Sequence, residues 1–207
     1  MPSILNAGES YTFRSYFDMS YDIDKILAEF GYAFCTDRLV LPRTSRDISP
    51  LLQLKQEIET NLKLTILSSE ISRREAVIAP ILFAVARFCH CQIRLEYVLN
   101  VNDWLKGNLD YLLKSEQTFL VVEAKKDDLA KGFTQLATEL IAVSEYEGKS
   151  ILYGAVTIGD AWRFGVLDAK QKLITQDIAL IPIPDRIEEL LQILVGILLD
   201  TSEVVTP

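Results

Sequence analysis

The segment that most constrains the fold is Phe119–Lys125, an apolar run that ends in an acid and a lysine. Side chains alternate between the two faces of a strand, so Glu123 and Lys125 would share one face with Phe119 and Val121. The residues between them are apolar as well, which is typical of a central strand that is covered on both faces. Buried charges are costly unless they are paired or used, so the end of this strand predicts a functional site.

A second predicted strand, Leu109–Lys114, could pair antiparallel with this segment through a turn centred on Glu116 and Gln117. In that register the numbers of paired residues add up to 233, which places Asp110 directly opposite Glu123. Directly opposed residues lie on the same face, with Cβ atoms roughly 5 Å apart. Two carboxylates at that distance need a cation between them, or one must hold a proton. A slip of one residue would turn Asp110 to the other face.

The two predicted acids suit a hard divalent cation, Mg²⁺ or Mn²⁺, because such ions prefer oxygen ligands. Lys125 lies two residues beyond Glu123 on the same predicted face. Its ammonium group could activate an attacking water and neutralise the charge that grows on a phosphoryl oxygen. Asp110, Glu123 and Lys125 therefore predict metal-dependent hydrolysis of phosphodiester bonds.

The spacing of these residues resembles that of the PD-(D/E)xK nuclease superfamily, which has the restriction-endonuclease-like fold. Asp110 is followed thirteen residues later by Glu123-Ala124-Lys125. The resemblance implies that Asp110 and Glu123 bind the metal ion and that Lys125 serves the attacking water. The chain departs from the literal motif at Leu109, which stands where the motif has proline.

Two helix residues extend the resemblance. Gln135 lies on the predicted helix after the lysine strand, where many members carry a glutamine, and it would position the water or the backbone. Glu75 lies on the helix before the first core strand, where many members carry a glutamate. It would orient a ligand or bind a second metal ion, with Glu70 as the second choice. The resemblance covers roughly residues 69–167 and leaves the first third of the chain unexplained.

The overall pattern predicts an α/β (α+β) fold with a restriction-endonuclease-like core, in which helices flank a central mixed β-sheet. A helical accessory region, residues 1–67, would precede the core and its C-terminal helix, residues 68–207. We expect this region to hold a helix at Tyr21–Phe34, a strand at Leu39–Pro42 and a helix from Asp47 to about Leu64.

The core elements follow from periodicity. A helix at 71–88 would be kinked at Pro80. The strand at 92–101 would carry Ile93, Leu95, Tyr97 and Leu99 on one face. The other expected elements are strands at 109–113 and 119–125, a helix at 128–143, a hairpin of 150–158 with 161–167, a strand at 176–183 and a helix at 186–199.

Composition limits the functional classes. Hydrophobic residues make up 49% of the 207 residues and charged residues 24%, as in ordinary globular proteins. The formal net charge of −8 counts against a protein that coats nucleic acid through a basic surface. A nuclease stays compatible with this charge, because carboxylates gather at its site. His90 is the single histidine, which excludes a multi-histidine metal site.

Cysteine usage bears on the compartment. Cys35, Cys89 and Cys91 are a small, odd number, typical of a reducing environment. Cys89-His90-Cys91 has no second Cys/His pair that would complete a zinc site, so we expect it to pack in the core. We find no signal peptide and no apolar run of the ~20 residues that span a bilayer. We therefore expect a cytoplasmic protein without membrane contact.

The leading hypothesis is a Mg²⁺-dependent nuclease that acts on DNA. Its site residues would be Asp110, Glu123, Lys125, Gln135 and Glu75, with Asp110, Glu123 and Glu75 as metal ligands. A second hypothesis is a catalytically inactive binding or regulatory module that keeps the nuclease fold. A third is a structural homodimer, whose contact face would be the C-terminal helix Arg186–Leu199.

Overall fold

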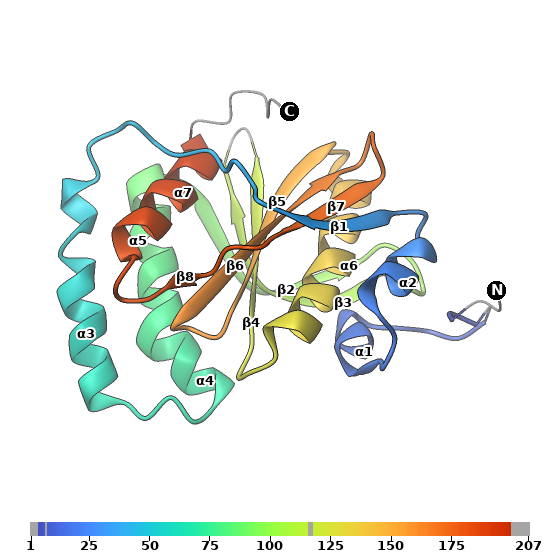
Figure 1. Cartoon of the computed structure of the whole chain (residues 1–207), viewed down its shortest axis with the longest axis horizontal. Coiled ribbons are helices and arrows are strands. Elements are labelled where there is room, and N and C mark those ends of the chain that lie inside the picture. The colour runs from blue at the N-terminus through green and yellow to red at the C-terminus, as the bar shows by residue number, and fades with distance from the viewer. Residues whose placement is uncertain (1–3, 7, 116–117, 200–207) are drawn as a thin grey trace.

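The computed structural model describes residues 4–6, 8–115 and 118–199, and these form an eight-stranded mixed sheet with helices on both faces (Figure 1). The predicted α/β class is confirmed. The strand order is β1-β7-β6-β5-β4-β3-β2, and β8 pairs with β6. The strands span Ala33–Asp37 (β1), Gln92–Asn100 (β2), Lys106–Lys114 (β3), Phe119–Ala124 (β4), Ile151–Thr157 (β5), Ala161–Asp168 (β6), Leu173–Asp177 (β7) and Ile181–Pro182 (β8).

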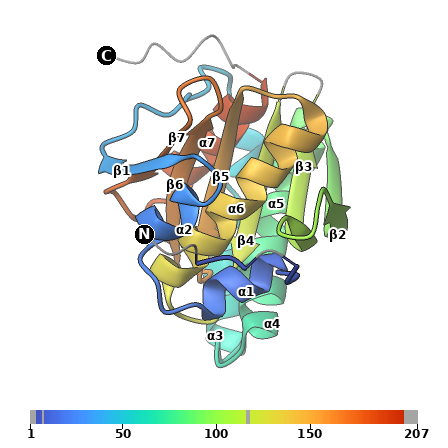
Figure 2. The same cartoon turned by 90° about the vertical axis from the view of Figure 1, so that its right-hand side faces the viewer.

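The helices form a layer on each side of the sheet (Figure 2). On one side α6 packs with α1 and α2, and on the other side lie α3, α5 and α7. Among the described residues, no helix combines the length and the apolar character that crossing a membrane requires. The helices span Phe13–Asp18 (α1), Ile23–Ala28 (α2), Leu54–Leu64 (α3), Glu70–Arg73 (α4), Ala79–Cys89 (α5), Leu129–Glu147 (α6) and Ile187–Leu199 (α7), with a 3-10 turn at Ser49–Leu51 and a π-helical turn at Arg74–Ile78.

The strand β4 is central and has the predicted register with β3. The pairs run from Tyr111 with Val122 to Lys114 with Phe119, so the paired residue numbers add up to 233 as expected. The turn residues themselves lie outside the described residues. Beyond the other edge of β4, β5 runs parallel to it, and α6 makes the crossover that parallel strands require. This arrangement brings the end of β4 beside the start of α6.

The helix expected at 71–88 is present but is divided. Ser69 caps α4, since its hydroxyl accepts a hydrogen bond from the Ser72 amide at 3.1 Å. A π-helical turn then leads to Pro80, which has no amide hydrogen to donate to the carbonyl of Ala76. Asn61 of α3 takes over this role, because its Nδ2 donates to the Ala76 carbonyl at 2.9 Å. The π-helical turn thus precedes Pro80, and a kink at Pro80 itself stays a prediction.

The N-terminal region corrects two predictions. The helix expected at Tyr21–Phe34 ends at Ala28, and Ala33–Asp37 forms the edge strand β1, parallel to β7. The strand predicted at Leu39–Pro42 is wrong, since these residues form no regular element. Residues 1–67 are therefore not wholly helical, because they add a strand to the sheet. The reason is tertiary: the exposed edge of β7 offers hydrogen bonds to a segment without strong helical preference.

Two more expectations fail at the other elements. The single strand expected at 176–183 is divided into β7 and β8. The C-terminal helix, expected as a dimer face, has its apolar residues buried within the chain, where α7 packs on α5. An expected homodimer would therefore need another surface. The hairpin of β5 and β6 and the helix α6 are confirmed close to their expected bounds.

The prediction that β2 places four apolar side chains on one face is wrong. Glu96 has a φ of +47°, and the pairing of β2 with β3 skips Glu96 and the opposing Asp110. As a result Ile93 packs on one side of the sheet and Tyr97 on the other. Glu96 instead pairs with Arg74 of the π-helical turn, with Nη1 and Oε1 2.5 Å apart.

Replacement of Asn61 tests how the divided helix is stabilised. We expect Asn61→Ala to lower the free energy of unfolding by about 1–2 kcal/mol in urea titrations, because the Ala76 carbonyl loses its donor. Lys63→Ala on the exposed side of α3 is the control and should change little. In a Pro80→Ala background, Asn61→Ala should lower the free energy of unfolding by a smaller amount, because residue 80 then has an amide hydrogen that can bond to the Ala76 carbonyl. An equal cost in both backgrounds would contradict this explanation.

Candidate metal and phosphodiester site

Glu123 and Lys125 lie at the end of β4, on the face that α6 covers. The Lys125 ammonium forms an ion pair with Oε1 of Glu123, and Gln135 Nε2 donates to the same oxygen at 2.7 Å. Glu123 is 1% exposed and Lys125 is 4% exposed. Gly132 permits this approach, because a Cβ there would lie 2.9 Å from Lys125 Cγ and 2.8 Å from Cγ2 of Val156. The predicted face of β4 and the position of Gln135 are thereby confirmed.

Asp110 of β3 lies beside the same strand end. Its Oδ2 accepts a hydrogen bond from the Ala124 amide at 2.8 Å. The regular pairing of β3 with β4 stops at Tyr111 and Val122, so the pairing of Asp110 directly opposite Glu123 stays a prediction. Its Oδ1 lies 3.5 Å from Nη1 of Arg74. The structure therefore brings together four predicted residues: Asp110, Glu123, Lys125 and Gln135.

Glu139 belongs to this group and was missed by the sequence analysis. It lies one helical turn after Gln135 on α6 and is fully buried, and its Oε1 accepts from Gln135 Nε2 at 2.8 Å. The signal that could have revealed it is the four-residue spacing from Gln135, which places two residues on one helix face. Both carboxylates of this network, on Glu123 and Glu139, thus hold the same amide group.

Three buried oxygens in this network have no hydrogen-bond partner in the described part of the chain. They are Oε2 of Glu123, Oε1 of Gln135 and Oε2 of Glu139. Buried polar atoms are nearly always satisfied, so each exception asks for a reason. A bound cation, or a proton on a carboxylate, would give these oxygens the partner that they lack.

The acids of this network have raised pKa values, because they are buried and close to one another. Burial, followed by repulsion from Glu139 and Asp110, raises the pKa of Glu123 well above its usual range. Burial raises the pKa of Glu139 to about 7, and burial also raises the pKa of Asp110. Burial alone would lower the pKa of Lys125, but the adjacent Glu123 carboxylate raises it, which keeps the lysine charged. Three acids thus share one buried ammonium group.

The predicted third acid, Glu75, is not brought into this group. Its side chain is exposed on the π-helical turn. Glu70, the second choice, lies closer: it lines the same cleft as Lys125, and its charge acts on Asp110. The difference arises from the π-helical turn, which rotates the residues after Arg73 relative to a regular helix.

The carboxylates beside the end of β4 are hard oxygen donors, the kind that Mg²⁺ prefers. Among the described residues, no three His, Cys, Asp or Glu side chains are arranged to hold a metal ion together. Mg²⁺ does not require such a set, because proteins usually hold it through one or two carboxylates while substrate and water supply the rest. Asp110 and Glu123 are such a pair, and the unpartnered Oε2 of Glu123 is a hard donor.

A cleft of about 350 Å³ leads to Lys125; we call it the Lys125 cleft. Arg14 and Phe17 of α1 form one wall, and the start of α4 forms another. Figure 2 shows α1 and α4 at the same end of the sheet as the start of α6. The cleft is lined by Arg14, Phe17, Ser68, Ser69, Glu70, Lys125, Lys126 and Asp127.

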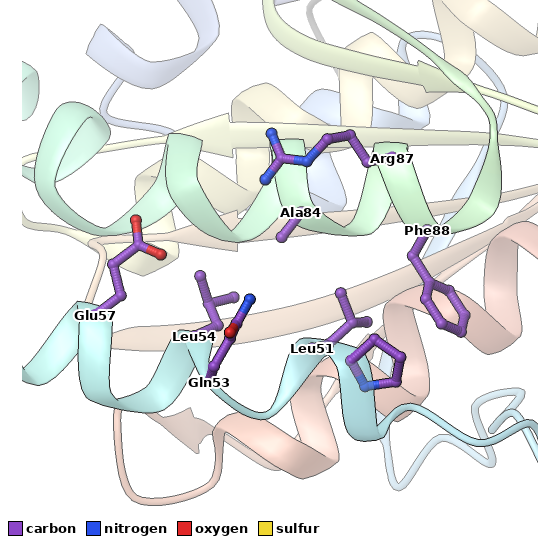
Figure 3. A pocket seen from close by; sticks show the side chains of 8 residues that line it. Leu51, Gln53, Leu54, Glu57, Ala84, Arg87 and Phe88 are labelled. Carbon is purple, nitrogen blue, oxygen red and sulfur yellow. The ribbon is translucent and has the colours of Figure 1, made fainter.

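A second cleft, between α3 and α5, carries no comparable chemistry. Its walls are mainly apolar, with Glu57 and Arg87 on opposite helices (Figure 3). It contains none of the predicted site residues. Of the predicted site residues, Lys125 and the second-choice acid Glu70 line the Lys125 cleft.

Comparison of the chain with protein-family models, with curated proteins and with solved structures found no match. The relation to the PD-(D/E)xK superfamily is therefore a proposal that rests on the motif and on the geometry of the site.

The stability of the metal-free protein should depend on pH through the buried acids. The pKa of Glu139 rises from 4.5 to about 7 on folding, so the folded state binds protons more tightly than the unfolded state. This contribution is complete below about pH 4.5 and is lost as the pH rises through about 7. We expect the free energy of unfolding in EDTA to fall by about 2 kcal/mol between pH 5 and pH 8.

Glu139→Gln should remove the part of this pH dependence that Glu139 contributes, because the amide cannot ionise, and should leave the part that arises from the raised pKa values of Glu123 and Asp110. Glu145→Gln, on an exposed position of the same helix, is the matched control. Chemical unfolding at several pH values measures the effect. A rise in stability over the same pH range, or an unchanged slope in Glu139→Gln, would contradict this account of the buried acids.

Proposed function

We propose that this chain is a Mg²⁺-dependent nuclease of the PD-(D/E)xK type that hydrolyses phosphodiester bonds in DNA. The observation that carries the proposal is the position of Asp110 beside the Glu123-Ala124-Lys125 strand end, next to a cleft with cationic walls. Asp110, Glu123 and Lys125 resemble the motif of that superfamily in kind, order and strand context. The mixed sheet flanked by helices agrees with the fold that the resemblance implies.

Asp110 and Glu123 would hold the metal ion. Glu123 offers its unpartnered Oε2, and Asp110 lies beside the same peptide through its bond to the Ala124 amide. When bound, Mg²⁺ supplies Lewis-acid polarisation of the phosphate and makes water a better nucleophile at neutral pH. The binding of a cation here would also relieve the repulsion between the acids.

Lys125 supplies positive charge at the base of the cleft. Its raised pKa keeps it an ammonium group at neutral pH, so it acts as a donor and a charge and not as a general base. It can orient the attacking water and stabilise the charge on a phosphoryl oxygen. Gln135 and Glu139 are positioning residues. The Gln135 amide donates hydrogen bonds to both Glu123 and Glu139, and so fixes the Glu123 carboxylate in place.

The wall of the cleft adds substrate binding to this chemistry. Arg14 and Lys126 lie at exposed positions around Lys125, where they can contact phosphates of the chain. Such contacts position a nucleic acid without reading its sequence. We place the activity in the cytoplasm, since Cys35, Cys89 and Cys91 form no disulfide bond in the described part of the chain.

Cleavage of plasmid and oligonucleotide DNA in Mg²⁺ or Mn²⁺ tests the proposal. We expect Asp110→Asn, Glu123→Gln and Lys125→Met each to lower the rate by about 10²-fold or more, because the first two weaken a metal ligand and the third removes the positive charge that stabilises the phosphoryl oxygen. The control is Asp103→Asn, on an aspartate whose side chain is 84% exposed. Thermal melts should show that each variant is folded. Equal rates in all folded variants would reject the assignment.

The second candidate is a binding or regulatory module that keeps the nuclease fold without turnover. The near-complete burial of Glu123 and the net charge of −8 favour it. Calorimetric titration with Mg²⁺ and Mn²⁺ separates the two candidates. Binding that is lost in Asp110→Asn supports the nuclease, and an absence of binding by the folded protein supports the module.

A further inference from the structure

We propose that the Lys125 cleft admits single-stranded nucleic acid and excludes an intact duplex. This inference deepens the proposed function and rests on it, because it names the substrate class of the same site. It also gives a role to the N-terminal segment that the resemblance leaves unexplained.

The first argument is the depth of the site. Lys125 is 4% exposed, Glu123 is 1% exposed and Gln135 is 5% exposed. Of these three residues Lys125 lines the cleft, so a phosphate must enter the cleft to contact it. A duplex is stiff over about 50 nm and cannot bend one backbone into a narrow recess, whereas a single strand can.

The second argument is the size of the opening and its walls. The volume of about 350 Å³ lies near the lower end for small-molecule pockets. This space suits a phosphate with its neighbouring sugar. Arg14 and Phe17 of α1 stand on one side, with Ser68 and Ser69 before α4 on the other.

The third argument is the aromatic ring in the wall. The Phe17 ring is half-buried, with the Arg14 guanidinium 4.4 Å and the Lys125 Nζ 5.1 Å from its centroid. An aromatic ring among cations is typical of sites that hold single strands, because an unpaired base stacks on the ring. The Arg14 side chain is 58% exposed, so a base could displace it from the ring or stack on it. Bases in a duplex are already stacked and cannot do so.

The fourth argument is the charge of the molecule. Duplex binding depends on many cations that replace condensed counterions, and this chain has a net charge of −8. The cleft offers Arg14, Lys125 and Lys126 against Glu70 and Asp127. The few positive charges of the cleft suit a short stretch of single strand that also gains from stacking, because duplex binding needs many cations.

Fluorescence anisotropy of the full chain tests the inference. The probes are a labelled single-stranded DNA of about 12 nucleotides, the same strand in a blunt duplex, and a single-stranded RNA of the same sequence. We expect roughly tenfold tighter binding of the single strands than of the duplex, and Mg²⁺-dependent cleavage of single strands in preference to duplex. The RNA arm shows whether the sugar is discriminated.

Variants of Phe17 test the stacking. Phe17→Leu should weaken single-strand binding by roughly tenfold. Phe17→Trp should retain the binding, and its fluorescence should be quenched by the bound strand, which a merely structural role would not produce. Phe83→Leu is the matched control, since Phe83 of α5 is 37% exposed and lies outside the Lys125 cleft.

The outcomes separate this inference from the proposed function. Equal affinity and equal cleavage for duplex and single strand would overturn the inference and leave the nuclease intact. Preference for single strands in binding, without cleavage in Mg²⁺ or Mn²⁺, would support the inference and favour the binding module. Absence of binding to any of the probes by the folded protein would overturn the inference.

Discussion

The hydrogen bond from the Ala124 amide to the Asp110 carboxylate connects the fold of this chain to its candidate chemistry. The register of β3 and β4 places Asp110 level with the end of β4, where the regular pairing stops. Its side chain then accepts the amide that follows Glu123. A shift of one residue would remove this bond and turn Asp110 to the other face of the sheet. The position of the acids therefore depends on strand pairing, and α6 then covers them.

The charges within this region are unbalanced. Glu123 and Glu139 lie in the interior, Asp110 is close by, and Lys125 is the ammonium group that pairs with Glu123. Nη1 of Arg74 lies 3.5 Å from Oδ1 of Asp110. Buried carboxylates of this kind hold protons or cations, because three negative charges exceed the two positive charges of Lys125 and Arg74 in a region with little water. The unpartnered oxygens of Glu123 and Glu139 mark where the missing charge would lie. In the proposed function, a hard cation with a phosphate beside it would supply this charge.

Much of the site was predictable because it depends on local rules. The alternation of side chains along β4 and the residue numbers of the β3–β4 pair need only strand geometry, and both are confirmed by the observed register. The position of Gln135 follows from helix periodicity after the strand. These features involve residues that are close in sequence or strands joined by a short turn. For such residues, the periodicity of the strand or helix determines which face each side chain occupies.

The parts that were not predictable depend on contacts between distant segments. Glu139 is buried because α6 packs on β4 and β5, which its own sequence does not reveal. Glu75 is exposed on the π-helical turn before Pro80. The side chains of β2 change face at Glu96, which pairs with Arg74 of that turn. The strand β1 forms because β7 offers it an edge. In each case a tertiary contact outweighs a local preference.

A crystal structure of the protein soaked in Mn²⁺ tests the central claim most directly, because the anomalous signal of the metal locates it without reference to activity. We predict a peak in contact with carboxylate oxygens of both Asp110 and Glu123, with the Lys125 ammonium displaced from its ion pair with Glu123. The peak should be absent from crystals of Asp110→Asn. Electron density in which Lys125 stays paired with Glu123, with no metal beside Asp110 at saturating Mn²⁺, would contradict the claim.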